Sequence, residues 1–218
     1  MFRDKPTVHK VNWQRLDKSS AHHVLDHIAR EVDKGLFPEI STEVKCQSLD
    51  FCKNFMLYRL TNYAAMPSFR MDFLSDGENF YYLSGSAEPI YNVNKRAPIA
   101  LREDNILNYL DFFFTNVKSE DGDIYIVRDP ASLPFMSSLP QEQQIELNAH
   151  HLKPSIEFDA MTDAYIIKTT LYYAGGLMTS VISVSTSGEI DFLDLKLLLS
   201  DMTHYFEVQS AEDYYVRA

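Results

Sequence analysis

One segment, from Tyr165 to Leu193, constrains the fold of this chain more than any other. Two runs rich in β-branched and aromatic residues lie on either side of Gly175-Gly176. Such a glycine pair predicts a two-residue hairpin turn, because the turns that suit antiparallel strands require positive φ angles. The sequence therefore predicts a long β-hairpin in which Tyr173 lies opposite Met178.

The side chains of this hairpin divide between two faces, since alternate residues of a strand point to opposite sides of a sheet. One face is mainly apolar and aromatic and comprises Tyr165, Ile167, Thr169, Leu171, Tyr173, Met178, Ile182 and Val184. The other face is mostly polar and includes Lys168, Thr170, Thr179, Ser183 and Ser185. This division is typical of an antiparallel sheet that other elements cover on one side only.

A second turn follows at Ser187-Gly188. A two-residue loop would place Asp191 on the apolar face and would place Ile190 and Phe192 on the polar face. A three-residue loop with a left-handed Gly188 shifts the register by one residue and reverses this outcome. We therefore predict the three-residue loop, a bulged turn that buries Ile190 and Phe192.

The rest of the chain supplies a second β-unit and several helices. A hairpin is predicted at residues 68–84, because Asp76-Gly77 lies between two aromatic runs and sets Phe73 opposite Phe80. Apolar residues at helical spacing predict helices at about 20–34, 103–117 and 141–150. Gly35 is expected to end the first helix in the left-handed conformation. The connection 84–101 contains two prolines and is expected to be extended.

These elements define an α+β fold, in which an antiparallel β-meander (164–193) and a hairpin (68–84) pack against one or two main helices. The layout is similar to that of cystatin-like and NTF2-like domains, and folds of this kind host many functions. No low-complexity linker interrupts the sequence, so we expect a single domain over residues 1–218. Its ends are an N-terminal arm (1–18) and an acidic, aromatic C-terminal tail (203–218).

Charge and cysteine content narrow the classes of partner. The net charge is −11; residues 1–100 hold 13 basic and 12 acidic side chains, and residues 101–218 hold 7 and 19. A nucleic-acid-binding protein needs a basic surface, which the acidic second half argues against. No apolar run approaches the roughly 18 residues that cross a membrane, and the first residues lack the apolar core of a secretory signal. We therefore expect a cytoplasmic protein that binds neither nucleic acid nor membranes, with Cys46 and Cys52 buried and reduced.

A cluster of histidines on the first predicted helix is the candidate metal site. His23 and His27 lie one helical turn apart, and Glu31 follows one turn later. The string His23-x-x-Asp26-His27 echoes the zinc-peptidase pattern HxxEH with Asp in place of Glu. The apolar stripe of this helix centres near Ile28, however, and His23 points away from it. A catalytic zinc site also needs a third ligand and a sheltered cavity, so a solvated helix face and a metal site are the two interpretations.

The polar face of the meander is the candidate ligand site. The bulged turn lines up Lys168, Ser183 and Asp191, with a cation and a carboxylate two strands apart, at about 10 Å between backbones. Such a row could bracket a small ligand, or it could be a solvated sheet face. Lys95 and Arg96, in the neighbouring connection, are the most suitable contacts for an anion.

Three functional hypotheses follow from these observations. All seven glycines lie at predicted turns or helix ends, and neither phosphate-binding loops nor a GxSxG motif occurs. We therefore expect a non-enzymatic interaction or regulatory module that needs no cofactor. The alternative is a small-molecule-binding protein or enzyme with its pocket on the polar face of the 165–193 meander. The third hypothesis is a metal-dependent hydrolase that uses the His23/His27 helix.

Overall fold

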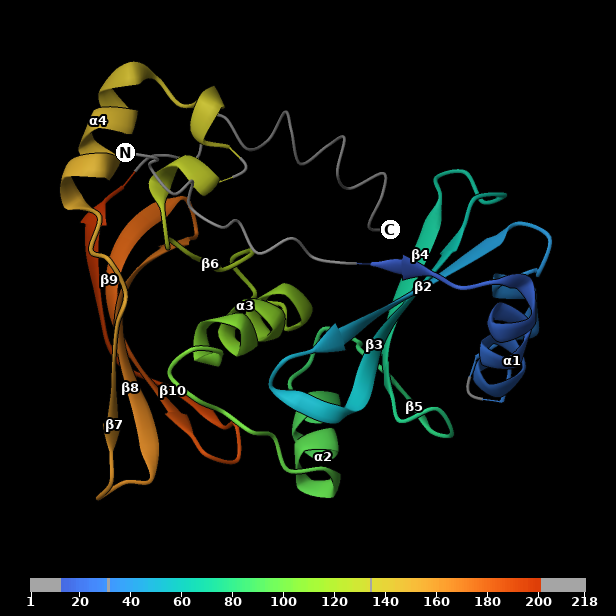
Figure 1. The fold of residues 1–218 in the computed structure, drawn as a ribbon. Coiled ribbons are helices and arrows are strands. Elements are labelled where there is room, and N and C mark those ends of the chain that lie inside the picture. The colour runs from blue at the N-terminus through green and yellow to red at the C-terminus, as the bar shows by residue number, and fades with distance from the viewer. Residues whose placement is uncertain (1–12, 31, 134, 201–218) are drawn as a thin grey trace, which may run out of the picture.

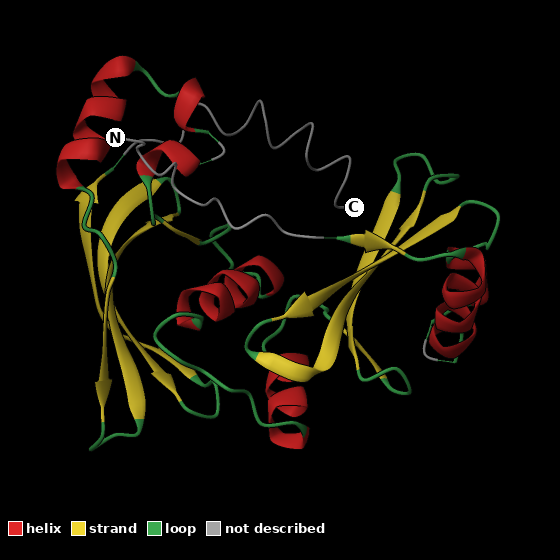
Figure 2. Ribbon diagram, viewed as in Figure 1, coloured by secondary structure: helices red, strands yellow, loops and turns green. Residues whose placement is uncertain are grey.

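Two antiparallel sheets of five strands each form most of the described part of the chain (Figure 1, Figure 2). This computed structural model describes residues 13–30, 32–133 and 135–200. Two helices lie between the sheets, a further helix packs on the outer side of the first sheet, and another packs at one end of the second (Figure 2). The fold is therefore α+β with antiparallel sheets, as the sequence predicts.

The first sheet contains the N-terminal strands, each hydrogen-bonded to the next in sequence. These strands are β1 (Gln14–Arg15), β2 (Thr42–Leu49), β3 (Cys52–Asn62), β4 (Phe69–Ser75) and β5 (Phe80–Tyr82). Helix α1 (Lys18–Ile28) begins after Asp17, whose carboxylate accepts a hydrogen bond from the Ser20 amide at 2.9 Å. Its buried side chains, Val24 and Ile28, pack with apolar side chains of β2, β3 and β4 in one cluster.

The second sheet contains the C-terminal strands. Its order is β10 (Ile190–Leu199), β9 (Gly176–Ser185) and β8 (Ala164–Tyr173), and β8 pairs on its far side with β6 (Tyr125–Ile126) and β7 (Ser155–Asp159). The three long strands form a meander, and β10 lies at one edge of the sheet.

Helices α2 (Glu88–Arg96) and α3 (Ile106–Asn116) carry the core between the sheets. Ile106, Tyr109 and Leu110 of α3 are completely buried. They belong to one cluster with side chains of both sheets, including Phe55, Leu57, Leu74, Ile167, Leu171 and Ile182. The two sheets therefore share a continuous hydrophobic core, which α3 fills.

The short elements complete the fold. They are the 3-10 helices η1 (Lys34–Leu36), η2 (Pro130–Ser132) and η3 (Met136–Ser138), and helix α4 (Gln141–His150), which has the predicted bounds. Leu147 of α4 packs with Tyr172 and Leu177 over one end of the second sheet. Within the described ranges, no helix is long and apolar enough to cross a membrane.

The bulged turn between β9 and β10 is confirmed. Ile190 lies opposite Val184, and Gly188 has a φ of 87°. Ile190 is partly buried against the core, whereas Phe192 remains 44% exposed. The prediction is therefore correct for the register and for Ile190, and wrong for the burial of Phe192.

The first hairpin of the meander has a different register from the predicted one. Tyr173 lies opposite Gly176, because Ala174 and Gly175 form the two-residue turn, with φ angles of 50° and 73°. The cross-strand partner of each residue is displaced by two positions from the prediction, so every side chain keeps its predicted face. Gly176 is glycine for another reason: a Cβ there would lie 2.9 Å from a methyl carbon of Leu197 on β10.

The 68–84 hairpin is confirmed, again with a shifted register. Phe73 lies opposite Tyr82, so the loop has four residues instead of two. The Asp76 carboxylate accepts hydrogen bonds from the amides of Glu78 and Asn79, at 3.0 and 2.8 Å. The Asp76 side chain stabilises the longer loop, because its carboxylate is the hydrogen-bond acceptor for these two backbone amides.

Two further predictions are wrong. The connection 84–101 is not extended throughout, since α2 occupies its centre; Pro89 lies in the first turn, where a helix tolerates proline. Helix α1 ends at Ile28, and Gly35 lies in η1 with its amide donating to the Asp33 carboxylate at 2.8 Å.

Other predictions concern the cysteines and the ends of the chain. Cys46 and Cys52 are free and buried, as expected, and burial raises the pKa of both thiols. The arm predicted at 1–18 lies largely outside the described residues, and the tail predicted at 203–218 lies wholly outside them.

Candidate functional site

Strand β10 forms a long edge of the second sheet. Eight of its ten residues pair with β9 on one side, and no strand of the described chain pairs with it on the other. An unpaired edge presents backbone N–H and C=O groups outward, where another strand can bind them. β10 is the red strand at the border of its sheet in Figure 1.

Large apolar side chains are exposed along this edge. Seven consecutive residues, 191–197, are exposed. The large apolar ones, with their exposed fractions, are Phe192 (44%), Leu193 (59%), Leu195 (44%) and Leu197 (54%). Scattered exposed apolar residues are normal on a protein surface, but a contiguous group indicates an interaction site.

Two irregularities divide β10 into segments. The pairing with β9 shifts between Phe192 and Asp194, and again between Leu197 and Leu199. The run Asp194–Leu197 between these bulges is regular and lies opposite residues 178–181. It contains the charged side chains Asp194 and Lys196, and neither makes an ion pair with another described residue.

A buried polar cluster fixes where β10 begins. The Tyr109 hydroxyl donates a hydrogen bond to the Gly188 carbonyl at 2.6 Å, and the Asn94 amide donates to the Ser187 carbonyl at 3.2 Å. Asn94 also donates to the Tyr109 oxygen at 3.1 Å. Burial raises the pKa of Tyr109, so its hydroxyl keeps its proton. Helices α2 and α3 thereby hold the turn from which β10 extends.

The structure does not form the predicted row of Lys168, Ser183 and Asp191. Asp191 lies opposite Ser183 as predicted, but Lys168 lies opposite Val181, two residues further along the sheet. This change follows from the shifted register of the β8–β9 hairpin. Lys168 and Asp191 are both exposed.

The polar face of the meander is covered at one end only. Thr170, near this end, is buried, and its hydroxyl accepts a hydrogen bond from the Leu152 amide at 2.8 Å. The segment between β6 and β7 supplies the cover with its apolar side chains, Leu133, Phe135, Leu139 and Leu147. These side chains pack around Tyr172. Its burial raises the pKa of the Tyr172 hydroxyl to about 12.

Lys95 and Arg96 lie in the last turn of α2, and both are exposed. Arg96 donates a hydrogen bond to the Tyr81 hydroxyl and lies over the Tyr81 ring, 5.3 Å from its centre. Arg96 therefore joins α2 to β5, which gives this predicted anion contact a structural partner. The two residues are far in sequence from Lys168, and the structure shows no contact between these two groups.

His23 and His27 lie side by side on α1, with ring centres 4.2 Å apart. His23 is exposed, and the His27 Nδ1 atom lies 2.9 Å from the His23 carbonyl oxygen. Glu31 lies outside the described residues. Among the residues that are described, no group of three or more His, Cys, Asp or Glu side chains is arranged to hold a metal ion.

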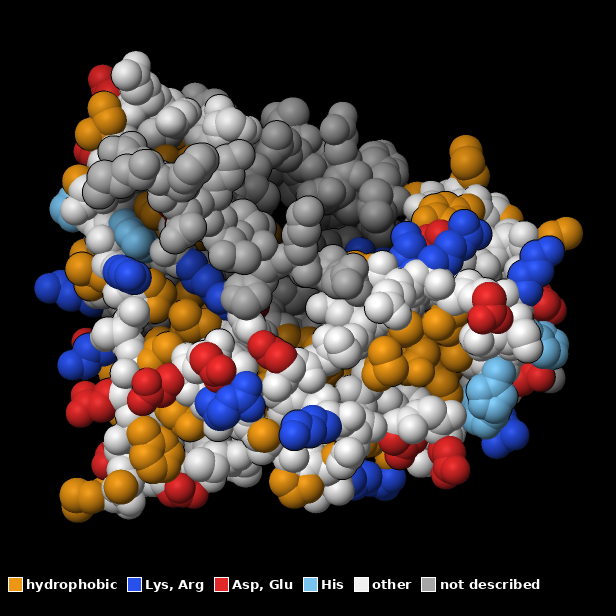
Figure 3. All heavy atoms as spheres, viewed as in Figure 1, with side chains coloured by type: hydrophobic (Ala, Val, Ile, Leu, Met, Phe, Trp, Pro, Cys, Tyr) orange, Lys and Arg blue, Asp and Glu red, His pale blue; other side chains and the backbone are white. Residues whose placement is uncertain are grey.

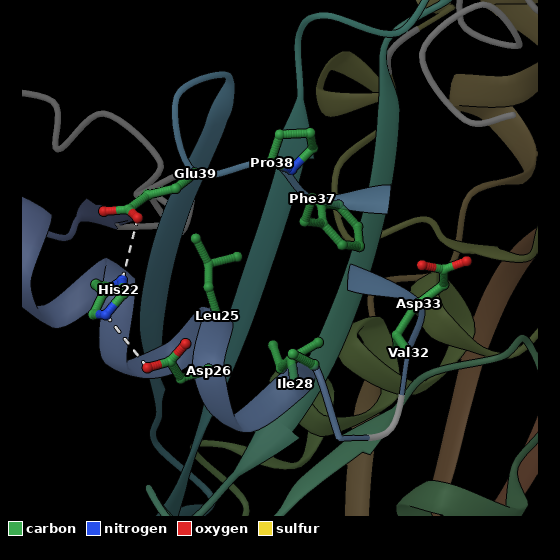
Figure 4. A pocket seen from close by; sticks show the side chains of 10 residues that line it. His22, Leu25, Asp26, Ile28, Val32, Asp33, Phe37, Pro38 and Glu39 are labelled. Atoms are coloured by element: carbon green, nitrogen blue, oxygen red, sulfur yellow. Dashed lines mark hydrogen bonds and ion pairs between the residues drawn. The ribbon is translucent and has the colours of Figure 1, made fainter. Parts of the chain in front are cut away.

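A pocket of about 170 Å³ lies beside α1 (Figure 4). Its apolar side chains include Leu25, Ile28 and Phe37, and His22 lies at its border between the carboxylates of Asp26 and Glu39, at 3.3 and 3.2 Å. All three side chains are more than half exposed. Ion pairs at such exposure contribute little and do not by themselves indicate a ligand.

Charged side chains elsewhere are mixed. In the space-filling view, Lys and Arg lie among Asp and Glu over both halves of the described surface (Figure 3). This view therefore gives no site defined by one sign of charge, and the edge β10 remains the feature with the most distinctive exposure.

The sequence reasoning missed β10 as a candidate because it ended the meander at Leu193. The alternation of leucine with charged residues in Leu193–Leu197 signals that the strand continues. Its position at an edge, however, depends on which strands pair, and the sequence does not show this.

No protein-family model, curated protein sequence or solved structure matches this chain.

Proposed function

We propose that this protein is a non-enzymatic interaction module that binds a partner protein by strand addition to β10. In this mode an extended segment of the partner pairs with a free sheet edge; backbone hydrogen bonds provide affinity, and side chains provide specificity. The observation that carries the proposal is the row of exposed apolar side chains on an unpaired ten-residue edge.

The exposed side chains favour a bound state over a solvated one. Burying apolar surface contributes about 25 cal/mol per Å², and each of these side chains has about half of its surface available. Proteins that keep an edge strand unpaired usually shorten it or fill it with charges. β10 is long. In its regular run, the carboxylate of Asp194 and the ammonium group of Lys196 alternate with leucines.

The charges define the chemistry of the partner strand. Asp194 and Lys196 lie on the same face of the strand, two residues apart. A partner strand that pairs here is favoured when it carries a cation opposite Asp194 and an anion opposite Lys196, since opposite charges stabilise a cross-strand pair. We propose that the module acts in the cytoplasm, whose reducing conditions suit the free thiols of Cys46 and Cys52.

The proposal can be tested by photo-cross-linking in cells that produce the full chain. A photoreactive phenylalanine derivative replaces Leu193 on β10, and the control carries it at Leu152, which is 51% exposed outside the strand. We expect adducts from position 193 only, with the cross-linked peptides of the partner identified by mass spectrometry. The substitution Leu195→Asp together with Leu197→Asp should abolish them, because it places carboxylates along the edge.

The result is decisive only when the edge variant retains its thermal unfolding transition. Adducts that form equally from both positions, or that persist in the folded edge variant, would contradict strand addition at β10. Identification of the cross-linked peptide also shows whether the partner is another protein or a second copy of this chain.

A further inference from the structure

We infer that the strand that binds β10 is the β10 strand of a second copy of this chain, in an antiparallel arrangement around a two-fold axis at Leu195. This inference rests on the proposed strand addition and names its partner. A two-fold dimer uses the same surface on both copies, so the edge must be complementary to itself. The regular run Asp194–Leu197 meets this condition.

The charges of the run are self-complementary. When Leu195 lies opposite Leu195 of the second copy, Asp194 of each chain lies opposite Lys196 of the other. Residues that lie opposite each other share a face of the sheet, so both ion pairs form on one side. Each chain thus supplies the cation and the anion that the other requires, and the two charges have no ion-pair partner in the described chain.

Other registers within the run are unfavourable. A two-fold axis at Asp194 places two carboxylates opposite each other, and an axis at Lys196 places two ammonium groups opposite each other. An axis between two residues pairs side chains from different faces, which a continuous pleated sheet does not permit. The bulges on both sides of the run limit regular pairing to these residues. Leu195 is therefore the only centre in the run that brings opposite charges together.

The apolar side chains support the same register. Leu195 and Leu197 lie on the opposite face from the charges. With the axis at Leu195, the two Leu195 side chains meet directly, and each has Leu197 of the other copy as a diagonal neighbour within reach. Four leucines that are 44% or 54% exposed in one copy thereby cover one another.

Charge reversal tests this arrangement in the purified full-length protein. Asp194→Lys places two lysines opposite each other at both pairs, and Lys196→Asp places two aspartates there. We expect each variant to dimerise about tenfold more weakly than the unmodified protein in sedimentation equilibrium. An equimolar mixture of the two variants should form a mixed dimer with restored affinity, because each Lys then faces an Asp.

Asp191→Lys is the matched control. Asp191 is also exposed on β10 but lies outside the regular run, so its reversal should leave the dimer affinity unchanged. The inference is overturned if the unmodified protein is monomeric at all concentrations, or if mixing the two variants restores nothing. A cross-link from position 193 to a different protein would then still support strand addition, so the two proposals fail separately.

Discussion

The first sheet ends at both edges in short strands, whereas the second sheet ends in β10. β1 has two residues and β5 has three, while β10 has ten. Short edge strands are a common protection against unwanted pairing, because they offer few free backbone groups. The first sheet thus follows the usual design of a soluble protein, and the second sheet departs from it at one edge.

The charges of the two sheets show the same contrast. On the first sheet, Arg59 donates two hydrogen bonds to Asp72 on the neighbouring strand, both at 2.8 Å, and Lys45 pairs with Glu43 at 2.6 Å. On β10, Asp194 and Lys196 have no such partner among the described residues. The charges of the first sheet serve the fold, whereas we propose that those of β10 serve pairing with another chain.

The largest expected effect concerns the turn that positions β10. In Gly188→Ala the new Cβ would lie within 2.6 Å of atoms of Asn94, Ile99 and Tyr109, at a φ of 87°. We expect a loss of about 4 kcal/mol in the free energy of unfolding, measured by chemical denaturation. Gly77→Ala is the control in the first sheet, because Gly77 also has positive φ but no atom within 4 Å.

That control should lose only about 1 kcal/mol, the cost of left-handed backbone for alanine. Equal losses at Gly188 and Gly77 would show that the contacts around the β9–β10 turn do not hold it, and the contrast between the two hairpins would fail.

The hydroxyl of Tyr109 should have the next largest effect. Tyr109→Phe removes the hydrogen bond to the buried Gly188 carbonyl, and we expect the free energy of unfolding to fall by about 2 kcal/mol. Tyr63→Phe is the control on the first sheet, since the Tyr63 hydroxyl bonds to Glu43 but its side chain is exposed. That variant should change the same quantity by less than about 0.5 kcal/mol. A change of similar size in both variants would contradict this account of the turn.

The two edge strands can be compared directly. Phe192 on β10 and Tyr82 on β5 are 44% and 42% exposed, and their rings pack against Phe114 and Phe73. Replacing either by alanine should cost about 1.5 kcal/mol of folding free energy. Neither variant should weaken self-association in sedimentation experiments, because both residues lie outside the regular run Asp194–Leu197. If Phe192→Ala weakened it, the pairing between copies would extend beyond the bulge.

The smallest effect on stability is expected at Leu195. Leu195→Ser replaces a side chain that is 44% exposed, so the free energy of unfolding should fall by about 1 kcal/mol, while the dimer should weaken. Leu152→Ser, at a similarly exposed site, should lose a similar amount of stability and leave the dimer unchanged. A large loss of stability in Leu195→Ser would mean that this leucine serves the fold of a single chain.

The predictions from sequence were most accurate where the deciding interaction is local. The bulged turn at Gly188 was predicted correctly, because moving Ile190 and Asp191 by one residue changes which of them faces the core. The predicted Gly175-Gly176 turn lies one residue too far along the chain, which shifts the cross-strand register by two residues and leaves every side chain on its predicted face. A Cβ at Gly176 would crowd the Leu197 side chain and the Leu199 carbonyl oxygen on β10, and no local pattern reveals those contacts.

Helix α2 could have been predicted, whereas the exposure of β10 could not. Ile90, Val93 and Ala97 are buried and have helical spacing, and Pro89 is compatible with a first helical turn. The leucines of β10 have the alternation of an ordinary half-buried strand. Their exposure arises because α3 packs against the start of β10, through Phe114 and Phe192, and leaves the later leucines of the strand only partly covered, which is a property of the assembled fold.

Amide hydrogen exchange of β10 at low and high protein concentration tests the central claim most directly. Exchange reports which backbone N–H groups are hydrogen-bonded and shielded, residue by residue. We predict that the outward-facing amides within Asp194–Leu197, which do not bond to β9, exchange more slowly at high concentration, whereas those of β5, the edge of the first sheet, do not change. Exchange of β10 that is independent of concentration would contradict the claim that this chain associates through the edge of its second sheet.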